Sequence, residues 1–201
     1  MKEAYEEEFD FLLLFLSGLL GVSAQRVALK NNLLYDATLT PNLALEIGVG
    51  PKMTVDLLGG VNPFKISDDH YWKHWLAQPE LRYWFCEKFN GVCIGLHGHV
   101  GQMNIAGISV PPVGSIHPKS DFDDARYHRY QGWFYGGGIS IGRQWILGNH
   151  WNLEASIGGG YIHFDYDKYQ CVECGKKVGV DKKADYFGLT RATLSLIYLF
   201  K

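Results

Sequence analysis

Apolar side chains occupy every second position over most of the chain after Gln25. Because side chains alternate between the two faces of a β-strand, this period predicts strands that are apolar on one face and polar on the other. No segment of useful length follows the helical period, so the pattern predicts an all-β fold. We expect eight strands, at residues 26–37, 42–50, 52–62, 80–87, 91–104, 130–145, 150–166 and 187–200.

The polar faces of these segments carry ionisable side chains beside small ones. In the segment 42–50, one face holds leucine, isoleucine and valine, whereas Glu46 shares the other with alanine and glycine. Two later segments place Arg82 and Arg191 on their polar faces in the same way. A soluble β-sandwich turns its apolar faces inward, whereas a transmembrane barrel turns them toward lipid.

The lengths of the connections favour the barrel. Short connections at 50–52, 87–91 and 146–149 alternate with long ones at 63–79, 105–129 and 167–186. Outer-membrane barrels have short periplasmic turns and longer extracellular loops. We therefore expect an eight-stranded antiparallel transmembrane β-barrel.

Aromatic residues on the apolar faces favour the same fold. They form two groups, one toward each end of the predicted strands, as the two interfaces of a bilayer select. The group near the short turns contains Phe85, Trp151, Tyr198 and Phe200, and the other contains Tyr35, Trp133, Tyr135 and Tyr161.

The charged residues of the polar faces would point into the barrel. The interior of an eight-stranded barrel is only wide enough for side chains to fill, and buried charges are stable only when they pair. The sequence therefore predicts an ion-pair network in the lumen and leaves its individual pairs open. Its predicted members are Lys30, Glu46, Asp56, Glu80, Arg82, Glu154 and Arg191.

The N-terminal segment has the pattern of a signal peptide. An apolar run from Phe11 to Val22 precedes Val22-Ser23-Ala24, a small-residue cleavage motif. We expect residues 1–24 to be a cleaved signal peptide and residues 25–201 to be a single domain. The start is acidic where signal peptides are basic, and a buried helix is the alternative. The chain has 19 basic and 21 acidic residues and a net charge of −2, which gives no indication of nucleic-acid binding.

Four cysteines form two pairs in the sequence. Cys86 and Cys93 flank a turn, and a register that sets them opposite each other permits a disulfide in an exported protein. The same register would set Arg82 opposite His97 and Glu80 opposite His99. In the loop 167–186, a second possible disulfide or half of a zinc site is formed by Cys171 and Cys174.

The histidines give no predicted catalytic or metal site. His97 and His99 share a face near Glu80, but hydrogen-bonded histidines inside the barrel are the favoured interpretation, so we predict no metal and no cofactor. His163 points outward near the extracellular end, whereas Ser140 and Ser156 point inward, so no nucleophile and base share a face. In the loop 63–79 the sequence suggests a short amphipathic helix or an interfacial lid containing His70, Trp72, His74 and Trp75.

Two segments, Asn32–Ala37 and Pro79–Trp84, resemble a family of small outer-membrane barrels of Gram-negative anaerobes that is catalogued as a domain of unknown function. The resemblance covers essentially the whole chain after residue 24. It implies an outer-membrane location, and such proteins are often encoded near fimbria-like surface structures. It implies no catalytic residues.

Together these patterns predict a structural or surface-interaction protein of the bacterial outer membrane rather than an enzyme. Its expected partners are membrane lipid and, through the loops 63–79, 105–129 and 167–186, a surface or fimbrial protein or a glycan, with no nucleic acid. The alternatives are a lipid A hydrolase or acyltransferase, a narrow channel, and a soluble sandwich or lipocalin-like binder.

Overall fold

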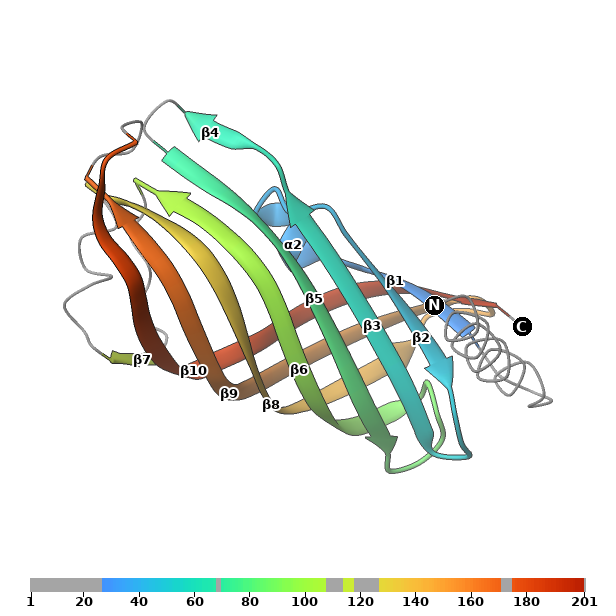
Figure 1. Cartoon of the computed structure of the whole chain (residues 1–201). Helices are drawn as coiled ribbons and strands as arrows, with labels where there is room; N and C mark the ends of the chain where they lie inside the picture. The colour runs from blue at the N-terminus through green and yellow to red at the C-terminus, as the bar shows by residue number, and fades with distance from the viewer. Residues whose placement is uncertain (1–26, 68–69, 108–113, 118–126, 171–174, 201) are drawn as a thin grey trace, which may run out of the picture.

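The computed structural model describes residues 27–67, 70–107, 114–117, 127–170 and 175–200. One antiparallel sheet dominates it (Figure 1). A single short helix, α2, accompanies the strands in the described part of the chain, and no helix there is long and apolar enough to cross a membrane. The elements are β1 (Val27–Asn32), α2 (Leu33–Ala37), β2 (Asn42–Gly48), β3 (Met53–Asn62), β4 (Lys65–Ser67), β5 (His70–Trp84), β6 (Gly91–Ala106), β7 (Gly114–His117), β8 (Arg129–Ile146), β9 (Trp151–Tyr169) and β10 (Lys177–Phe200).

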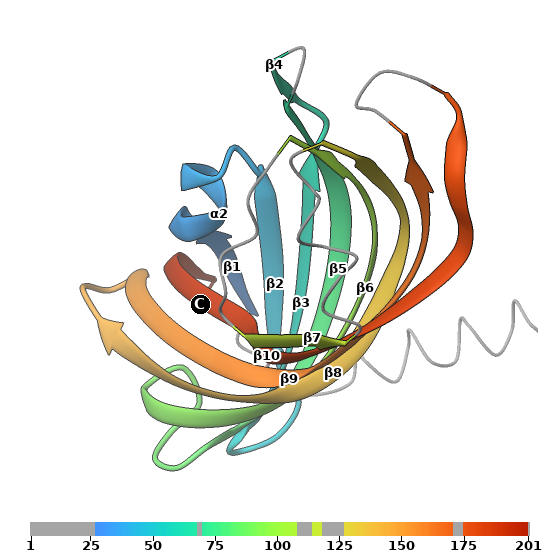
Figure 2. The ribbon, with the colours of Figure 1, turned by 90° about the vertical axis from the view of Figure 1, so that its left-hand side faces the viewer.

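Eight of the strands close into a ring in the order β1-β2-β3-β5-β6-β8-β9-β10. The first and last strands pair with each other, from Val27 opposite Phe200 to Asn32 opposite Ser195. Outside the ring, β4 pairs with β5 and β7 pairs with β10. Figure 2 views the ring from the end at which β4 and β7 lie. The prediction of an all-β fold with eight antiparallel strands is confirmed.

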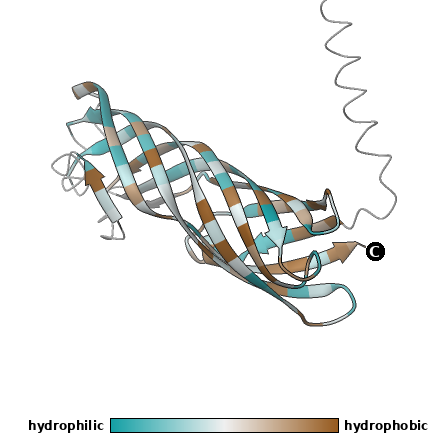
Figure 3. Ribbon diagram, turned by 90° about the horizontal axis from the view of Figure 1, so that it is seen from below, coloured by the Kyte–Doolittle hydropathy of each residue, from teal (hydrophilic) through white to brown (hydrophobic). Residues whose placement is uncertain are grey.

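The polar faces of the strands point into the ring and the apolar faces point out. Glu46 and Asp56 are fully buried, whereas Leu96 is 64% exposed and Ile139 is 70% exposed. Hydrophilic and hydrophobic stretches alternate along the strands in Figure 3. The inside-out arrangement predicted from the two-residue period is therefore confirmed.

The first predicted strand, at residues 26–37, is wrong at its C-terminal end. β1 stops at Asn32, and α2 follows directly. The side-chain oxygen of Asn32 accepts a hydrogen bond from the backbone N–H of Leu34 at 3.2 Å, so it acts as an N-cap. Asparagine is favoured at this position because it satisfies a backbone donor that the first helical turn leaves unpaired.

Two predicted long loops are largely strand. β5 begins at His70, so the expected amphipathic helix or lid in the segment 63–79 is wrong. β9 continues to Tyr169 and β10 begins at Lys177, which shortens the predicted loop 167–186. Trp72 and His74 are two residues apart and therefore continue the strand period. Backbone pairing with β6 extends as far as Tyr71, near the N-terminal end of β5. The predicted signal peptide, Cys171 and Cys174 lie outside the described residues.

Two glycine runs, Gly136–Gly138 on β8 and Gly158–Gly160 on β9, allow the strands to approach closely. Gly138 lies opposite Gly160 in the ladder. A Cβ added at Gly160 would overlap the carbonyl oxygen of Gly137 and the Cα of Gly138. These contacts involve backbone atoms, so a neighbouring side chain cannot relieve them by changing rotamer.

We expect Gly160→Ala to lower the free energy of unfolding by roughly 1–3 kcal/mol, the usual cost of overpacking. Gly59→Ala is the matched control, because nothing lies within 4 Å of a Cβ at that position. Its effect should stay within about 0.5 kcal/mol. Denaturant unfolding followed by tryptophan fluorescence measures both, and equal effects would contradict the close approach of β8 and β9.

Candidate functional site

The most concentrated chemistry of the described chain is a layer of charged side chains inside the ring. The seven residues predicted to form a network all lie in this layer, and each is at most 3% exposed. They come from six strands: β1, β2, β3, β5, β9 and β10. The layer contains four carboxylates, Glu46, Asp56, Glu80 and Glu154, and three cations, Lys30, Arg82 and Arg191.

Three of the carboxylates are direct cross-strand neighbours. Glu46 lies opposite Asp56, and Asp56 lies opposite Glu80. Carboxylates in such a row repel one another unless cations lie among them. Lys30 lies opposite Ala44, which is two residues before Glu46. Arg82 lies opposite Thr54, which is two residues before Asp56. Each cation is therefore one inward-facing position away from the row of acids. The row of acids is therefore held between two basic side chains.

The cations bridge the carboxylates across the ring. Lys30 Nζ lies 3.0 Å from Glu46, 3.3 Å from Asp56 and 2.8 Å from Glu154.

The guanidinium of Arg82 lies 3.2 Å from Glu46, 2.8 Å from Asp56 and 2.8 Å from Glu154. It also contacts Glu80 at 2.5 Å. Arg191 adds contacts of 3.0 Å to Asp56 and 3.2 Å to Glu80. Glu46 thus pairs with both Lys30 and Arg82, which answers the question that the sequence left open.

Neutral donors complete the layer. The hydroxyl of Thr54 donates to Glu46 at 2.5 Å, and the hydroxyl of Ser140 donates to Glu80. Arg191 also donates to the side-chain oxygen of Gln78 at 2.8 Å. Hydrogen bonds of this kind offset the cost of removing charged groups from water.

Apolar side chains close the ring on both sides of the charged layer. Near the short turns, Phe89 is 2% exposed and packs near Trp84, with ring centroids 6.2 Å apart. At the other end a second cluster fills the interior. Its buried members are Met103, Ile105, Tyr130, Tyr166 and Ala184, and Trp72, Ile116, Phe134 and Phe164 pack against them. The described interior is therefore filled with side chains.

Phe89 is an interior residue that sequence reasoning missed. It lies in a turn with φ of 65°, and Gly91, two residues later, has φ of 83°. A positive φ at a bulky residue is uncommon, and here it turns the ring of Phe89 into the interior. The only sequence signal was an aromatic residue inside the predicted short connection 87–91.

The hairpin between β5 and β6 differs in register from the prediction. Cys93 lies opposite Trp84, and Glu80 lies opposite His97. The predicted pairings of Cys86 with Cys93, of Arg82 with His97 and of Glu80 with His99 are therefore wrong. The isolated bridge between Glu87 and Asn90 makes the turn tighter than expected. Both thiols are free, with Cys86 exposed and Cys93 buried.

The two histidines on β6 lie next to the charged layer. His97 shares a hydrogen bond of 2.9 Å with Thr190, and its ring centroid is 5.9 Å from that of His99. His97 Nδ1 and both ring nitrogens of His99 have no hydrogen-bond partner in the described part of the chain. Among the described residues, no three His, Cys, Asp or Glu side chains are placed to hold a metal ion.

His163 lies on the outer face, near the end of the ring that carries β7. Its Nδ1 is 2.6 Å from Asp185, which also accepts a hydrogen bond of 2.5 Å from Tyr161. The carboxylate orients the imidazole, as a general base requires. Ser140 donates to Glu80 inside the ring, and Ser156 shares a hydrogen bond with Thr193. Neither serine is available to His163 as a nucleophile.

We expect Arg82→Met to lower the free energy of unfolding by about 3–5 kcal/mol, because it leaves four buried carboxylates with two cations, Lys30 and Arg191. Arg143→Met is the matched control, since Arg143 is exposed on β8, and its effect should stay within about 0.5 kcal/mol. Chemical denaturation monitored by tryptophan fluorescence compares the two. A small effect of Arg82→Met would show that the layer does not depend on its charges.

Comparison with known proteins gives one result. A family model described as "Protein of unknown function (DUF3575)" matches residues 10–200. No curated protein and no solved structure matches the chain.

Proposed function

We propose a function for this chain from the geometry of its structure. The chain belongs to the DUF3575 family, and the description of that family assigns no activity. The ring is an eight-stranded β-barrel of the bacterial outer membrane with a filled lumen. Its role is structural or surface-interacting, through the extracellular segments 63–79, 105–129 and 167–186. The observation that carries the proposal is a continuous apolar surface around a charged interior.

The apolar surface lies over the middle of the ring. A shallow groove of about 830 Å³ on this surface is lined mainly by aliphatic side chains, including Leu81, Ile94, Leu96, Ile139 and Ile157. A contiguous surface of exposed aliphatic side chains such as Leu96, Ile139 and Ile157 is unusual in a soluble monomer. Contact with acyl chains would remove it from water.

Aromatic side chains lie on both sides of the aliphatic band. Near the short turns Trp151 contacts Tyr198 with ring centroids 5.2 Å apart, and near the other end Tyr161 contacts Phe187 at 4.9 Å. Trp151 and Tyr161 are ten positions apart on β9 (161 − 151). At about 3.3 Å per residue and a tilt of ~40°, this separation is roughly 25 Å along the axis. Outer-membrane barrels have an apolar band of about that height.

The filled interior supports a non-conducting role. The charged layer lies between two apolar clusters, so the described interior offers no continuous polar path. Ions pass through pores that are lined by polar groups and water. A narrow channel is therefore less consistent with the packing than a structural barrel.

The ends of the strands beyond the upper aromatic group favour interaction at the surface. There β9 and β10 carry charged and aromatic side chains, among them Asp165, Asp167, Tyr169, Lys177 and Lys183. Polar strands that extend beyond the apolar band would stand above the bilayer. They would present a rigid surface to other molecules outside the cell.

We expect Leu96→Arg to lower the free energy of unfolding in lipid vesicles by about 2–4 kcal/mol, the cost of a cation on the lipid face near the midplane. Val180→Arg is the matched control, because Val180 is 59% exposed but lies on the part of β10 beyond the band. Its effect should stay within about 0.5 kcal/mol. Urea titration in vesicles measures both variants.

In water both substitutions would replace an exposed apolar side chain and would be tolerated equally. Equal stabilities of the two variants, together with recovery of the protein in the soluble fraction of cells, would therefore contradict the proposal. Recovery in the outer-membrane fraction with heat-dependent gel mobility would support it.

A further inference from the structure

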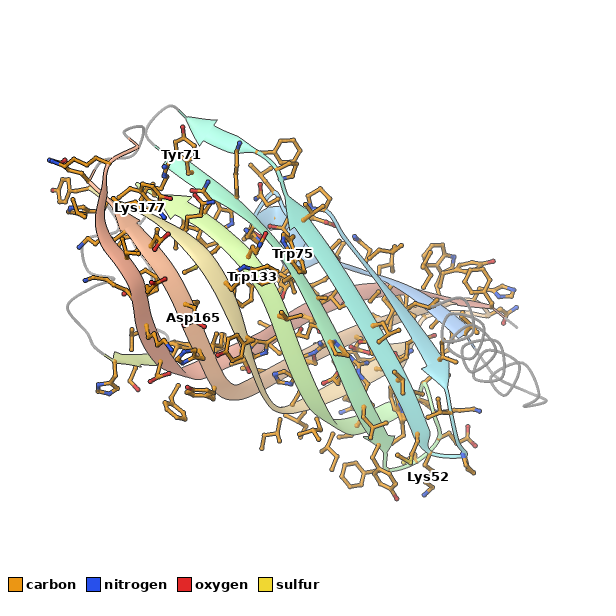
Figure 4. All side chains as sticks on the ribbon, in the orientation of Figure 1. Lys52, Tyr71, Trp75, Trp133, Asp165 and Lys177 are labelled. Carbon is orange, nitrogen blue, oxygen red and sulfur yellow. The ribbon has the colours of Figure 1, made fainter. Side chains whose placement is uncertain are left out.

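A groove of about 530 Å³ crosses the outer face of β5, β6, β8 and β9 beyond the aliphatic band. We call it the outer-rim groove. Figure 4 shows Trp75 and Trp133 close together at this end of the molecule, on the same side of the ring as Lys177. Its volume is within the range of small-molecule sites. The side chains that define it are Trp75, Gln102, Asn104, Gln131, Trp133 and Tyr169.

Two rows of cross-strand neighbours form the floor of the groove. In the first row Gln102 lies between Trp75 on one side and Trp133 on the other. In the second row, one step nearer the strand ends, Asn104 lies between Lys73 on one side and Gln131 on the other. Side-chain amides and indole rings therefore alternate over a small area.

The indole rings of Trp75 and Trp133 are both accessible from outside the ring of strands. Their centroids are 5.7 Å apart with an interplanar angle of 86°, and the residues are 37% and 47% exposed. The indole N–H of Trp75 donates to the side-chain oxygen of Gln102 at 3.0 Å, which fixes that ring. The side-chain oxygen of Asn104 is buried and has no hydrogen-bond partner among the described residues. A buried acceptor without a partner among these residues can accept a hydrogen bond from water or from a ligand.

One end of the groove is charged. Lys177 donates to Asp167 at 2.6 Å, and this hydrogen bond lowers the pKa of Asp167 below its usual range. The cation is therefore already paired with a carboxylate. Asp167 keeps acceptor capacity beyond this bond, because a carboxylate has about four acceptor sites.

We propose that the outer-rim groove binds a sugar unit of an oligosaccharide, either free or as the headgroup of a glycolipid. A pyranose ring has an apolar C–H face, which suits the face of an indole, and a rim of hydroxyl groups that both donate and accept. Side-chain amides also do both, so Gln102, Asn104 and Gln131 match that rim. The proposal depends on the proposed function for its position outside the cell.

Other occupants fit less well. A peptide that adds to a sheet needs an unpaired strand edge, but β5, β6, β8 and β9 each have a partner on both sides. A phosphate site usually gathers several cations that are not neutralised, whereas the groove has two lysines, of which Lys177 is paired with Asp167 and Lys73 is the second. A plain aromatic belt for lipid does not require amides between its tryptophans.

The test uses the full chain in detergent micelles. One arm probes an array of defined bacterial and host oligosaccharides, and the second titrates intact lipopolysaccharide, with phosphatidylglycerol as a sugar-free lipid. Trp133→Ala and Asn104→Ala remove one indole and one amide of the groove. Trp145→Ala is the matched control, because Trp145 is also exposed on β8 but lies near the short-turn end.

We expect binding to at least one saccharide or to lipopolysaccharide, a loss of affinity of at least tenfold in Trp133→Ala and Asn104→Ala, and no change in Trp145→Ala. Binding in the first arm identifies free oligosaccharide as a sufficient ligand, and binding only in the second identifies a glycolipid headgroup. No binding in either arm, equal competition by phosphatidylglycerol, or equal losses in Trp133→Ala and Trp145→Ala would overturn the inference.

The result is independent of the test of membrane location. Sugar binding by a protein recovered in the soluble fraction would support the groove and contradict the outer-membrane assignment. Absence of binding by a protein recovered in the outer membrane would contradict the groove alone.

Discussion

The structure depends on the pairing of seven charges inside the ring. Glu46, Asp56 and Glu80 lie side by side on neighbouring strands, an arrangement that like charges oppose. It is stable because Lys30 and Arg82 contact the acids from adjacent positions. Withdrawing each ion from water costs several kcal/mol, so incomplete pairing would be strongly destabilising. The ring therefore closes only in a register that brings these cations among the carboxylates.

The same register determines the outer surface. A slip of one residue exchanges the two faces of a strand, so the inward position of Glu46 places Leu45 and Ile47 on the outside. The apolar surface is thus a consequence of the charged interior, and both follow from one two-residue period. Outside the apolar band β9 and β10 continue as paired strands, with register shifts near Gly179, and their exposed residues include charged and aromatic side chains beside Val178 and Val180. The proposed membrane-facing and ligand-facing surfaces are successive parts of the same strands.

The sequence was sufficient for the eight strands, for their inward and outward faces and for the residues that the structure brings together in the charged layer. These features depend on side-chain alternation alone. It was insufficient for the individual ion pairs and for the β5–β6 register, because these depend on the closure of the ring and on the unusual backbone of Phe89. Strand ends were also missed. A local cap at Asn32 ends β1 early, whereas pairing with β6 extends β5 into a segment rich in polar and aromatic residues.

We infer that the apolar side chains of the ring contact lipid while the polar ones are enclosed. Spin labels placed one at a time at residues 92–100 of β6, with the protein in vesicles, test it most directly through their accessibility to oxygen and to a water-soluble nickel complex. We expect accessibility to vary with a period of two, in which positions 94, 96 and 100 are accessible to oxygen and shielded from nickel. Access of nickel to position 96 equal to that at an exposed loop position would contradict it.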